Sequence, residues 1–161
     1  MSEDHLLPTQ KQARIIRERA TRLAEEGRVA EAIRELGDAL RQDTREAGAW
    51  QLLGEIYGAA GYHEPAASYI QKCLQEDYSN IPAWVALTNI YAQIGGPYLE
   101  LAMEQVEAAF SFDSENADLH YLKGSIQAQQ GMLERAKECF QKCLELNSGH
   151  PYARHDLDAL G

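Results

Sequence analysis

Features typical of exported and membrane proteins are missing from this sequence of 161 residues. No uninterrupted apolar stretch reaches the roughly 18 residues that a membrane-spanning helix needs, so we expect no membrane insertion. The opening segment, MSEDHLLPTQKQ, lacks the basic start and the apolar centre of a secretory signal peptide. Cysteine is scarce, at 3 residues, and an odd number of thiols without an export signal favours a reducing compartment. We therefore expect a cytoplasmic protein.

Positive charge is in short supply as well. The chain has 15 Lys and Arg against 25 Asp and Glu, a net charge of −10, and no Lys or Arg occurs between Lys72 and Lys123. Nucleic-acid binding needs clustered basic side chains that contact phosphates, so the composition argues against such a partner. The simplest interpretation of the acidic surface is that it keeps the protein soluble. The alternative is that its field attracts a basic partner.

Motifs of catalytic and cofactor sites are also missing, including a phosphate-binding loop, a nucleophile elbow and a dinucleotide fingerprint. Cys139 and Cys143 are four residues apart, but no second pair of ligands accompanies them, so core packing is the better interpretation. His150 and His155 are five apart, a spacing that does not place both rings on one helical face. We predict no catalytic residue, no metal site and no cofactor, and therefore no enzyme.

What the chain does contain is an internal repeat. The segment AWQLLGEIYGAAG at 49–61 returns as AWVALTNIYAQIG at 83–95, shifted by 34 positions. Such a period is typical of repeat proteins whose units stack on one another. The period divides the chain into a lead segment 1–12, four repeats at 13–46, 47–80, 81–116 and 117–150, and a short C-terminal capping helix at 151–161 that ends early.

Each repeat divides at a glycine into two stretches with helical spacing of apolar residues. In the second repeat, Trp50, Leu53 and Ile56 precede Gly61, and Ile70 follows it. A glycine between two such stretches can adopt the left-handed conformation that ends a helix. We therefore predict an all-α fold of antiparallel helix pairs, in which stacking buries faces that no helix could bury alone. The glycines expected at the turns are Gly27, Gly61, Gly95 and Gly131.

These residues resemble the tetratricopeptide repeat family, whose unit of 34 residues has Trp, Leu, Gly and Tyr in its first helix. Two departures stand out, since the family's late proline is missing from all four repeats and GGPY at 95–98 lengthens the third. The resemblance implies a right-handed superhelical solenoid and covers residues 13–150. The second repeat carries the fullest set: Trp50, Leu53, Gly54, Tyr57, Gly61, Ala66, Ile70 and Cys73.

The resemblance also implies a concave groove lined by the first helix of each repeat. Its small and amide side chains suit the backbone of an extended peptide, whose N–H and C=O groups need partners. The alternative is that these are ordinary solvated positions. The expected lining is Arg14, Arg17, Gln51, Glu55, Asn89, Gln93, Tyr121, Ser125 and Gln129, with Tyr152 and His155 from the capping helix.

One subtype of the family can be set aside. Relatives that clamp the acidic C-terminus of chaperones use Lys, Arg and Asn at five groove positions. Only Arg17 fits that pattern here, because the other four positions hold Thr21, Leu52, Pro82 and Ala86.

We expect a protein-interaction scaffold that binds a peptide or protein segment in this groove, with a basic partner favoured by the charge. Two alternatives stay open. The chain is either the regulatory or substrate-recruiting arm of a larger enzyme, such as a transferase, or a self-associating assembly module. Self-association would use apolar residues at the turns, namely Val29, Leu99, Met132 and Leu133.

Overall fold

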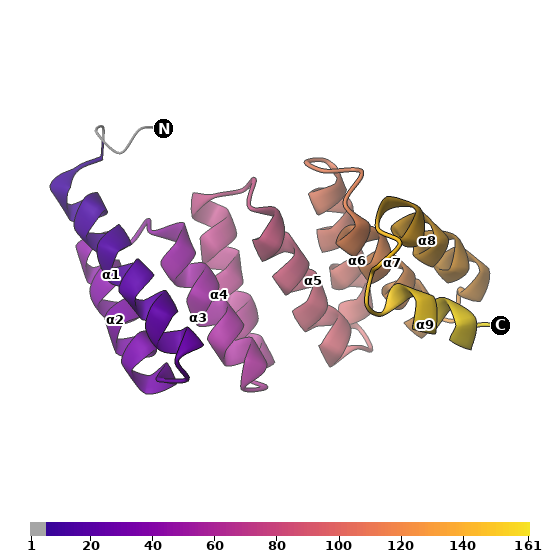
Figure 1. The fold of residues 1–161 in the computed structure, drawn as a ribbon, viewed down its shortest axis with the longest axis horizontal. Helices are drawn as coiled ribbons and strands as arrows, with labels where there is room; N and C mark the ends of the chain where they lie inside the picture. Colours follow the sequence, from indigo (N-terminus) through magenta and orange to yellow (C-terminus); the bar gives the residue numbers. More distant parts are fainter. Residues whose placement is uncertain (1–5) are drawn as a thin grey trace. The chain divides into compact units, whose positions relative to one another are not determined.

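The structure is a computed structural model that describes residues 6–161. Within this range the chain forms nine α-helices and no strand (Figure 1). The prediction of an all-α fold is therefore confirmed. The helices are α1 (Pro8–Glu25), α2 (Val29–Gln42), α3 (Ala47–Ala59), α4 (His63–Glu76), α5 (Ile81–Ile94), α6 (Tyr98–Phe110), α7 (Ala117–Gln129), α8 (Leu133–Leu146) and α9 (Ala153–Ala159).

The helices group into two compact units. The N-terminal unit, Met1–Tyr78, contains α1 to α4, and the C-terminal unit, Ser79–Gly161, contains α5 to α9. In the first, α1 packs along α2 and α3 along α4, while α2 and α3 are also in contact. In the second, α5 packs along α6 and α7 along α8, α7 contacts both helices of the preceding pair, and α9 lies against α8. Each pair is the antiparallel hairpin that the sequence predicts, as Figure 1 shows.

The turns within the pairs use glycine as expected. Gly27, Gly61 and Gly131 have φ angles of 78°, 83° and 79°, which a residue with a Cβ adopts only at a cost. The longer third repeat has two such residues in succession, Gly95 and Gly96, before Pro97 leads into α6. The two extra residues are thus absorbed in the turn, and α5 and α6 keep lengths of 14 and 13 residues.

Polar side chains replace the missing late proline at two helix starts. The side chain of Asn80 accepts a hydrogen bond from Ala83 N at 2.9 Å, and Pro82 lies in the first turn of α5, where a backbone N–H would have no helical partner. Asn116 caps α7 in the same way, accepting from Asp118 N and Leu119 N at 3.1 and 3.2 Å. Asn residues therefore fix where the first helices of the third and fourth repeats begin.

Within each pair the helices cross closely at one position, where residue sizes are complementary. A Cβ added to Gly124 would lie 2.7 Å from the ring of Phe140, and one added to Gly54 would clash with the side chain of Ile70. The third repeat instead places Thr88, which is fully buried, at the position of these glycines. The residue of the third repeat that corresponds to Ile70 and Phe140 is Val106, which is smaller than either. The four combinations are Ala20 with Leu36, Gly54 with Ile70, Thr88 with Val106, and Gly124 with Phe140.

The two tryptophans differ in burial. Trp84 is 5% exposed and belongs to the core, as predicted. Trp50 stays partly exposed: its ring stacks on Tyr69 with centroids 6.0 Å apart, and the ammonium group of Lys72 lies 4.5 Å from the ring centroid. Its indole N–H donates to the carbonyl oxygen of Thr44 at 2.8 Å. Trp50 is therefore held by a stacking, a cation–π and a polar contact together.

The ends of the array differ in detail from the sequence expectation. The first helix begins at Pro8, inside the segment 1–12 that we expected to precede the repeats, and residues 1–5 lie outside the described range. Pro at the first helical position explains the early start, because it needs no N–H partner there. The capping helix occupies only 153–159 of the segment 151–161.

In residues 6–161, no helix combines the length and the apolar character that crossing a bilayer requires.

Candidate functional site

The first helices of the C-terminal unit present a polar stripe. Asn89 and Gln93 on α5, and Gln129 on α7, are exposed, whereas Leu87 and Ile90 on the opposite side of α5 are buried. A methyl group built on Gly95 would lie 3.9 Å from Gln129 Oε1, so this amide reaches the end of the neighbouring helix α5. We call Asn89, Gln93, Ser125 and Gln129 the first-helix face. It offers exposed amide donors and acceptors from two adjacent helices.

Tyr121, expected in the groove, has a different environment. It is only partly exposed, and its hydroxyl donates to Asp156 Oδ2 of α9 at 2.8 Å. Its ring packs against His150, Tyr152 and Phe140, with centroid distances of 4.6, 6.0 and 5.7 Å. Burial, and then the hydrogen bond to Asp156, raise the pKa of Tyr121 above its ordinary value. The side chain thus holds the capping helix against α7.

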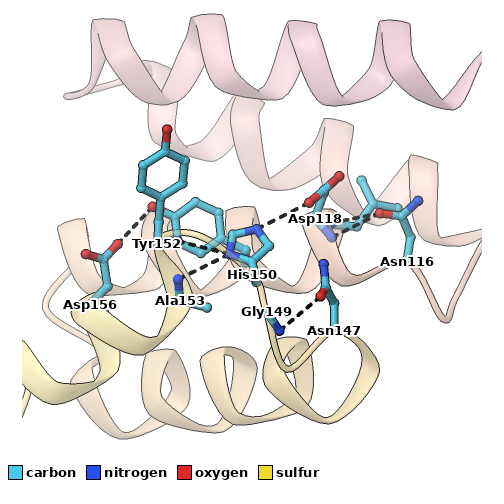
Figure 2. A network of polar contacts seen from close by, with 10 residues as sticks. Asn116, Asp118, Asn147, Gly149, His150, Tyr152, Ala153 and Asp156 are labelled. Atoms are coloured by element: carbon cyan, nitrogen blue, oxygen red, sulfur yellow. Dashed lines mark hydrogen bonds and ion pairs between the residues drawn. The ribbon is translucent and has the colours of Figure 1, made fainter.

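His150 completes this attachment, as Figure 2 shows. Its Nδ1 accepts hydrogen bonds from Ala153 N at 3.1 Å and from Tyr152 N at 3.4 Å, so the ring satisfies the first amides of α9. Its Nε2 lies 3.2 Å from Asp118 Oδ1, which fixes the proton on that nitrogen. The imidazole is 6% exposed. Sequence reasoning missed this role, because the spacing of His150 from its partners carries no motif.

The remaining residues expected from the capping helix lie on the surface. Tyr152 is 61% exposed, and the side chain of His155 is 85% exposed with Nδ1 at 3.0 Å from Asp156 Oδ1. His155 and His150 therefore have separate environments. In the part of the chain that the structure describes, no group of three His, Cys, Asp or Glu side chains could hold a metal ion.

The groove residues expected in the N-terminal unit interact within the chain. Arg14 Nε lies 3.3 Å from Glu18, and Arg17 Nε lies 3.0 Å from Glu46 Oε1 in the segment before α3. Gln51 donates to Glu55 Oε1, one turn later on α3, at 2.8 Å. All these side chains are at least partly exposed. They form a charged surface in which cations and carboxylates already offset one another.

The cysteines occupy the core positions that the sequence predicts. Cys73 and Cys143 are fully buried, and burial raises the pKa of both thiols to about 11. Cys139 is half-buried, its Sγ lies 3.3 Å from Gln127 Oε1, and burial raises its pKa as well. Raised pKa values suppress the thiolate, so these side chains are poor nucleophiles at neutral pH.

A cavity on the other side of α7 was not expected from the sequence. It has a volume of about 770 Å³ and lies between α6 and α8, floored by α7. A smaller cavity of about 360 Å³ shares Glu107 and Lys123 with it, so the two are adjacent. We call both together the α6–α8 groove. The larger part is lined by Glu100, Met103, Glu104, Glu107, Lys123, Gln127, Gln130, Met132 and Arg135.

Only part of the α6–α8 groove could have been found in the sequence. Glu100, Glu104 and Glu107 are spaced like one face of a helix, in a stretch without Lys or Arg. That pattern is visible from the letters alone. The opposing residues Met132 and Arg135 come from the next repeat, and only the packing of α6, α7 and α8 brings them together.

Solved structures of similar fold are tetratricopeptide proteins. A fragment of MamA from Desulfovibrio magneticus RS-1, residue 41 to the end, matches with a TM-score of 0.80 and 21% identity, over 92% of this chain and 82% of the other. A thermophilic tetratricopeptide protein from Thermus thermophilus gives 0.74 and 20%, over 92% and 80%. The first tetratricopeptide domain of Spaghetti (RPAP3), bound to the HSP90 peptide SRMEEVD, gives 0.67 and 19%, over 73% and 92%.

The sequence itself gives matches to one family. Residues 47–80 and 117–150 each match the tetratricopeptide repeat, and these ranges coincide with the second and fourth repeats read from the 34-residue period. No curated protein matches the chain by sequence. The fold is the all-α superhelical type of antiparallel helix pairs that the resemblance implies. The chain belongs to the tetratricopeptide repeat family.

Proposed function

We propose that this protein is a non-catalytic scaffold and that the first-helix face of its C-terminal unit binds an extended peptide segment of a partner. Tetratricopeptide repeats are typically interaction modules without catalytic activity, which supports the general role. The specific proposal rests on the exposed amides of Asn89, Gln93 and Gln129, which project from two adjacent helices. Amides both donate and accept, so they match the alternating groups of a peptide backbone.

A structural neighbour supports a peptide as the ligand. The tetratricopeptide domain of Spaghetti (RPAP3) binds an HSP90 peptide that ends in acidic residues. In this chain, Thr21, Leu52, Pro82 and Ala86 stand where chaperone-clamping relatives carry basic or amide side chains. We therefore propose a peptide ligand that is recognised through its backbone and not through an acidic end. The net charge of −10 favours a partner of opposite charge, because unlike charges speed the encounter.

Two further proposals follow from exposure and from the thiols. Val29, Met132 and Leu133 at the turns are 42%, 43% and 45% exposed, and such apolar side chains favour self-association. Light scattering at several protein concentrations tests this, since a constant monomer mass contradicts it. The three free cysteines, of which Cys73 and Cys143 are buried, support a cytoplasmic location. Fluorescence microscopy of the tagged protein in its own cells tests that assignment.

The peptide proposal is tested with selected peptides and paired variants. Peptides are selected from a phage-displayed random library on the wild-type protein, and their affinities are measured by fluorescence polarisation. We expect the double variant Asn89→Ala, Gln129→Ala to weaken binding by roughly 5- to 100-fold, the effect of losing two hydrogen bonds. The matched control is Gln75→Ala, Gln141→Ala, which removes two exposed amides from the second helices α4 and α8.

The control separates a loss of contact from a general loss of polarity. Peptides that bind through the first-helix face should keep their affinity for the control variant. If no peptide is selected, or if both double variants weaken binding equally, the first-helix face is not the binding site.

A further inference from the structure

We propose that the α6–α8 groove is a second binding surface, on the opposite side of α7 from the first-helix face, and that it binds a basic peptide segment. The groove lies wholly within the C-terminal unit, because α6 and α8 both pack against α7 there. Its larger part has a volume of about 770 Å³, which is the size of a small-ligand or side-chain binding pocket. Three aspects of its lining determine the chemistry of the occupant.

The first is an acidic wall along α6. Glu100 and Glu104 are exposed, and neither has an ion pair among the residues that the structure describes. They are four residues apart on one helix, which places their side chains about 6 Å from each other. Glu107, one turn further, is held at 2.6 Å by Lys123. Two unneutralised carboxylates on one wall therefore fit two Lys or Arg side chains of a partner.

The second is an apolar base with a hydrogen-bond donor. Met103 and Met132 line the groove from opposite sides, and their unbranched side chains adapt to an apolar residue of the occupant. Gln127 between them is only 7% exposed. Its oxygen accepts from Cys139, while its amide nitrogen has no hydrogen-bond partner among the described residues. Because Gln127 lines the groove, its N–H₂ group is available to donate to a backbone carbonyl of a bound peptide.

The third is the opposite wall, formed by α8, which in the larger part of the groove carries one cation. Arg135 on α8 faces the groove with its guanidinium 4.0 Å from the sulfur of Met132. Lys123 is already paired with Glu107, so the larger part of the groove has two carboxylates without an ion pair among the described residues, on the α6 wall, against one such cation, Arg135. A basic segment is therefore attracted along the α6 wall, and Arg135 disfavours basic side chains along the α8 wall. The charges on the two walls therefore favour a basic occupant, and they favour the orientation in which its basic side chains face α6.

Methionine provides a direct spectroscopic test. The protein has 3 methionines, and two of them, Met103 and Met132, line the groove, whereas Met1 lies at the end of the chain. We would label the methionine methyl groups with ¹³C and titrate the protein with the peptide acetyl-KLKRLK-amide, using acetyl-ELEELE-amide as the reference. The expected result is a saturable shift of the Met103 and Met132 signals with the basic peptide only.

Paired charge variants separate this groove from general electrostatic attraction. Glu100→Gln with Glu104→Gln should weaken the binding of the basic peptide by about fivefold, the effect of two exposed ion pairs. The control, Glu64→Gln with Asp158→Asn, changes the net charge equally at exposed positions outside the groove and should leave the affinity unchanged. Equal weakening by both variants, or no saturable shift of either methionine, would overturn the proposal.

The same titration distinguishes the two proposed surfaces. Backbone amide shifts confined to Asn89, Ser125 and Gln129 would place the peptide on the first-helix face and overturn the α6–α8 groove as its site. Shifts at Gln127 and Met132, without shifts at the first-helix face, support the α6–α8 groove as the site of the basic peptide. The proposal that the first-helix face binds an extended peptide is tested separately, by the phage selection described above.

Discussion

Substitution of Gly124 by alanine tests the packing on which the whole array depends. In α7 this glycine lies where the helix crosses α8, and its Cβ position is 2.7 and 2.8 Å from two ring carbons of Phe140 and 3.1 Å from the carbonyl oxygen of Ala136. Carbon atoms in contact are normally about 3.5–4.0 Å apart. Phe140 is 2% exposed, so its ring is enclosed by other residues and cannot turn out into solvent. The added methyl group must therefore push the two helices apart.

Two opposing effects determine how much Gly124→Ala changes the free energy of unfolding. Alanine is a better helix former than glycine, which alone would stabilise the variant by about 1 kcal/mol. Overpacking a well-filled core costs about 1–3 kcal/mol, and the rigid ring and the backbone oxygen place Gly124 towards the upper end. We expect the free energy of unfolding of Gly124→Ala to fall by about 1–2 kcal/mol. For a chain of this length that is a decrease of about 2–8 °C in Tm.

The assay is urea unfolding followed by circular dichroism, with Gly58→Ala as the matched control. A Cβ on Gly58 in α3 would meet nothing closer than the Cβ of Ala66 at 3.7 Å, an ordinary contact. The control should therefore be as stable as the wild type or more stable by up to about 1 kcal/mol. If both variants are stabilised, close packing does not explain the glycine.

A second substitution should reverse the effect. In the third repeat, the positions that correspond to Gly124 and Phe140 hold Thr88 and Val106, which are both fully buried, so a larger residue is paired with a smaller one. The double variant Gly124→Ala, Phe140→Leu should accordingly be more stable than the sum of its single changes predicts, by about 1 kcal/mol in a double-mutant cycle. Strict additivity would refute the size-complementarity argument.

Three further outcomes can be checked with standard methods. Trp84→Ala should lower the free energy of unfolding by about 3–5 kcal/mol, and Trp50→Ala by less because its ring is partly exposed; an equal loss in thermal melts would contradict the difference in burial. His150→Ala removes the cap of α9 and should speed amide exchange there by about fivefold, whereas His155→Ala should not. Burial raises the thiol pKa of Cys143 to about 11, so the folded state keeps a proton that the unfolded state releases near pH 9. The free energy of unfolding should therefore fall as the pH rises from about 9 to 11. The variant Cys143→Ala should show a smaller fall over the same pH range.

The fold could be predicted from the sequence because the same pattern of a helix pair with a turn glycine occurs in each of the four repeats. The period of 34 residues, the turn glycines and the helical spacing of Trp84, Leu87 and Ile90 all indicate the same hairpin, and the structure has them buried or at turns as expected. The caps at Asn80 and Asn116, which fix two of the helix starts, were not predicted. Agreement between the period, the turn glycines and the helical spacing makes such a fold predictable from its sequence.

The candidate sites were less predictable because they depend on contacts between repeats. Tyr121 was expected to face a ligand, yet its hydroxyl donates to Asp156, 35 residues later in the chain. His150 was weighed as a metal ligand with His155, yet it caps α9 and contacts Asp118. Neither partner is at a spacing that a local motif encodes. For these residues, tertiary packing determined the role.

The α6–α8 groove shows where specificity can arise in a protein made of similar parts. Met103 corresponds within its repeat to Ala67 in the second repeat, which is buried, and to Lys137 in the fourth, which pairs with Glu134. The same position thus belongs to the core in one repeat, to the lining of the α6–α8 groove in another and to an ion pair in a third. Positions that repeat maintain the stack, because each copy must fit the same neighbour. Positions that differ between repeats are free of that constraint, so a surface specific to one partner is expected where neighbouring repeats differ, as α6 and α8 do.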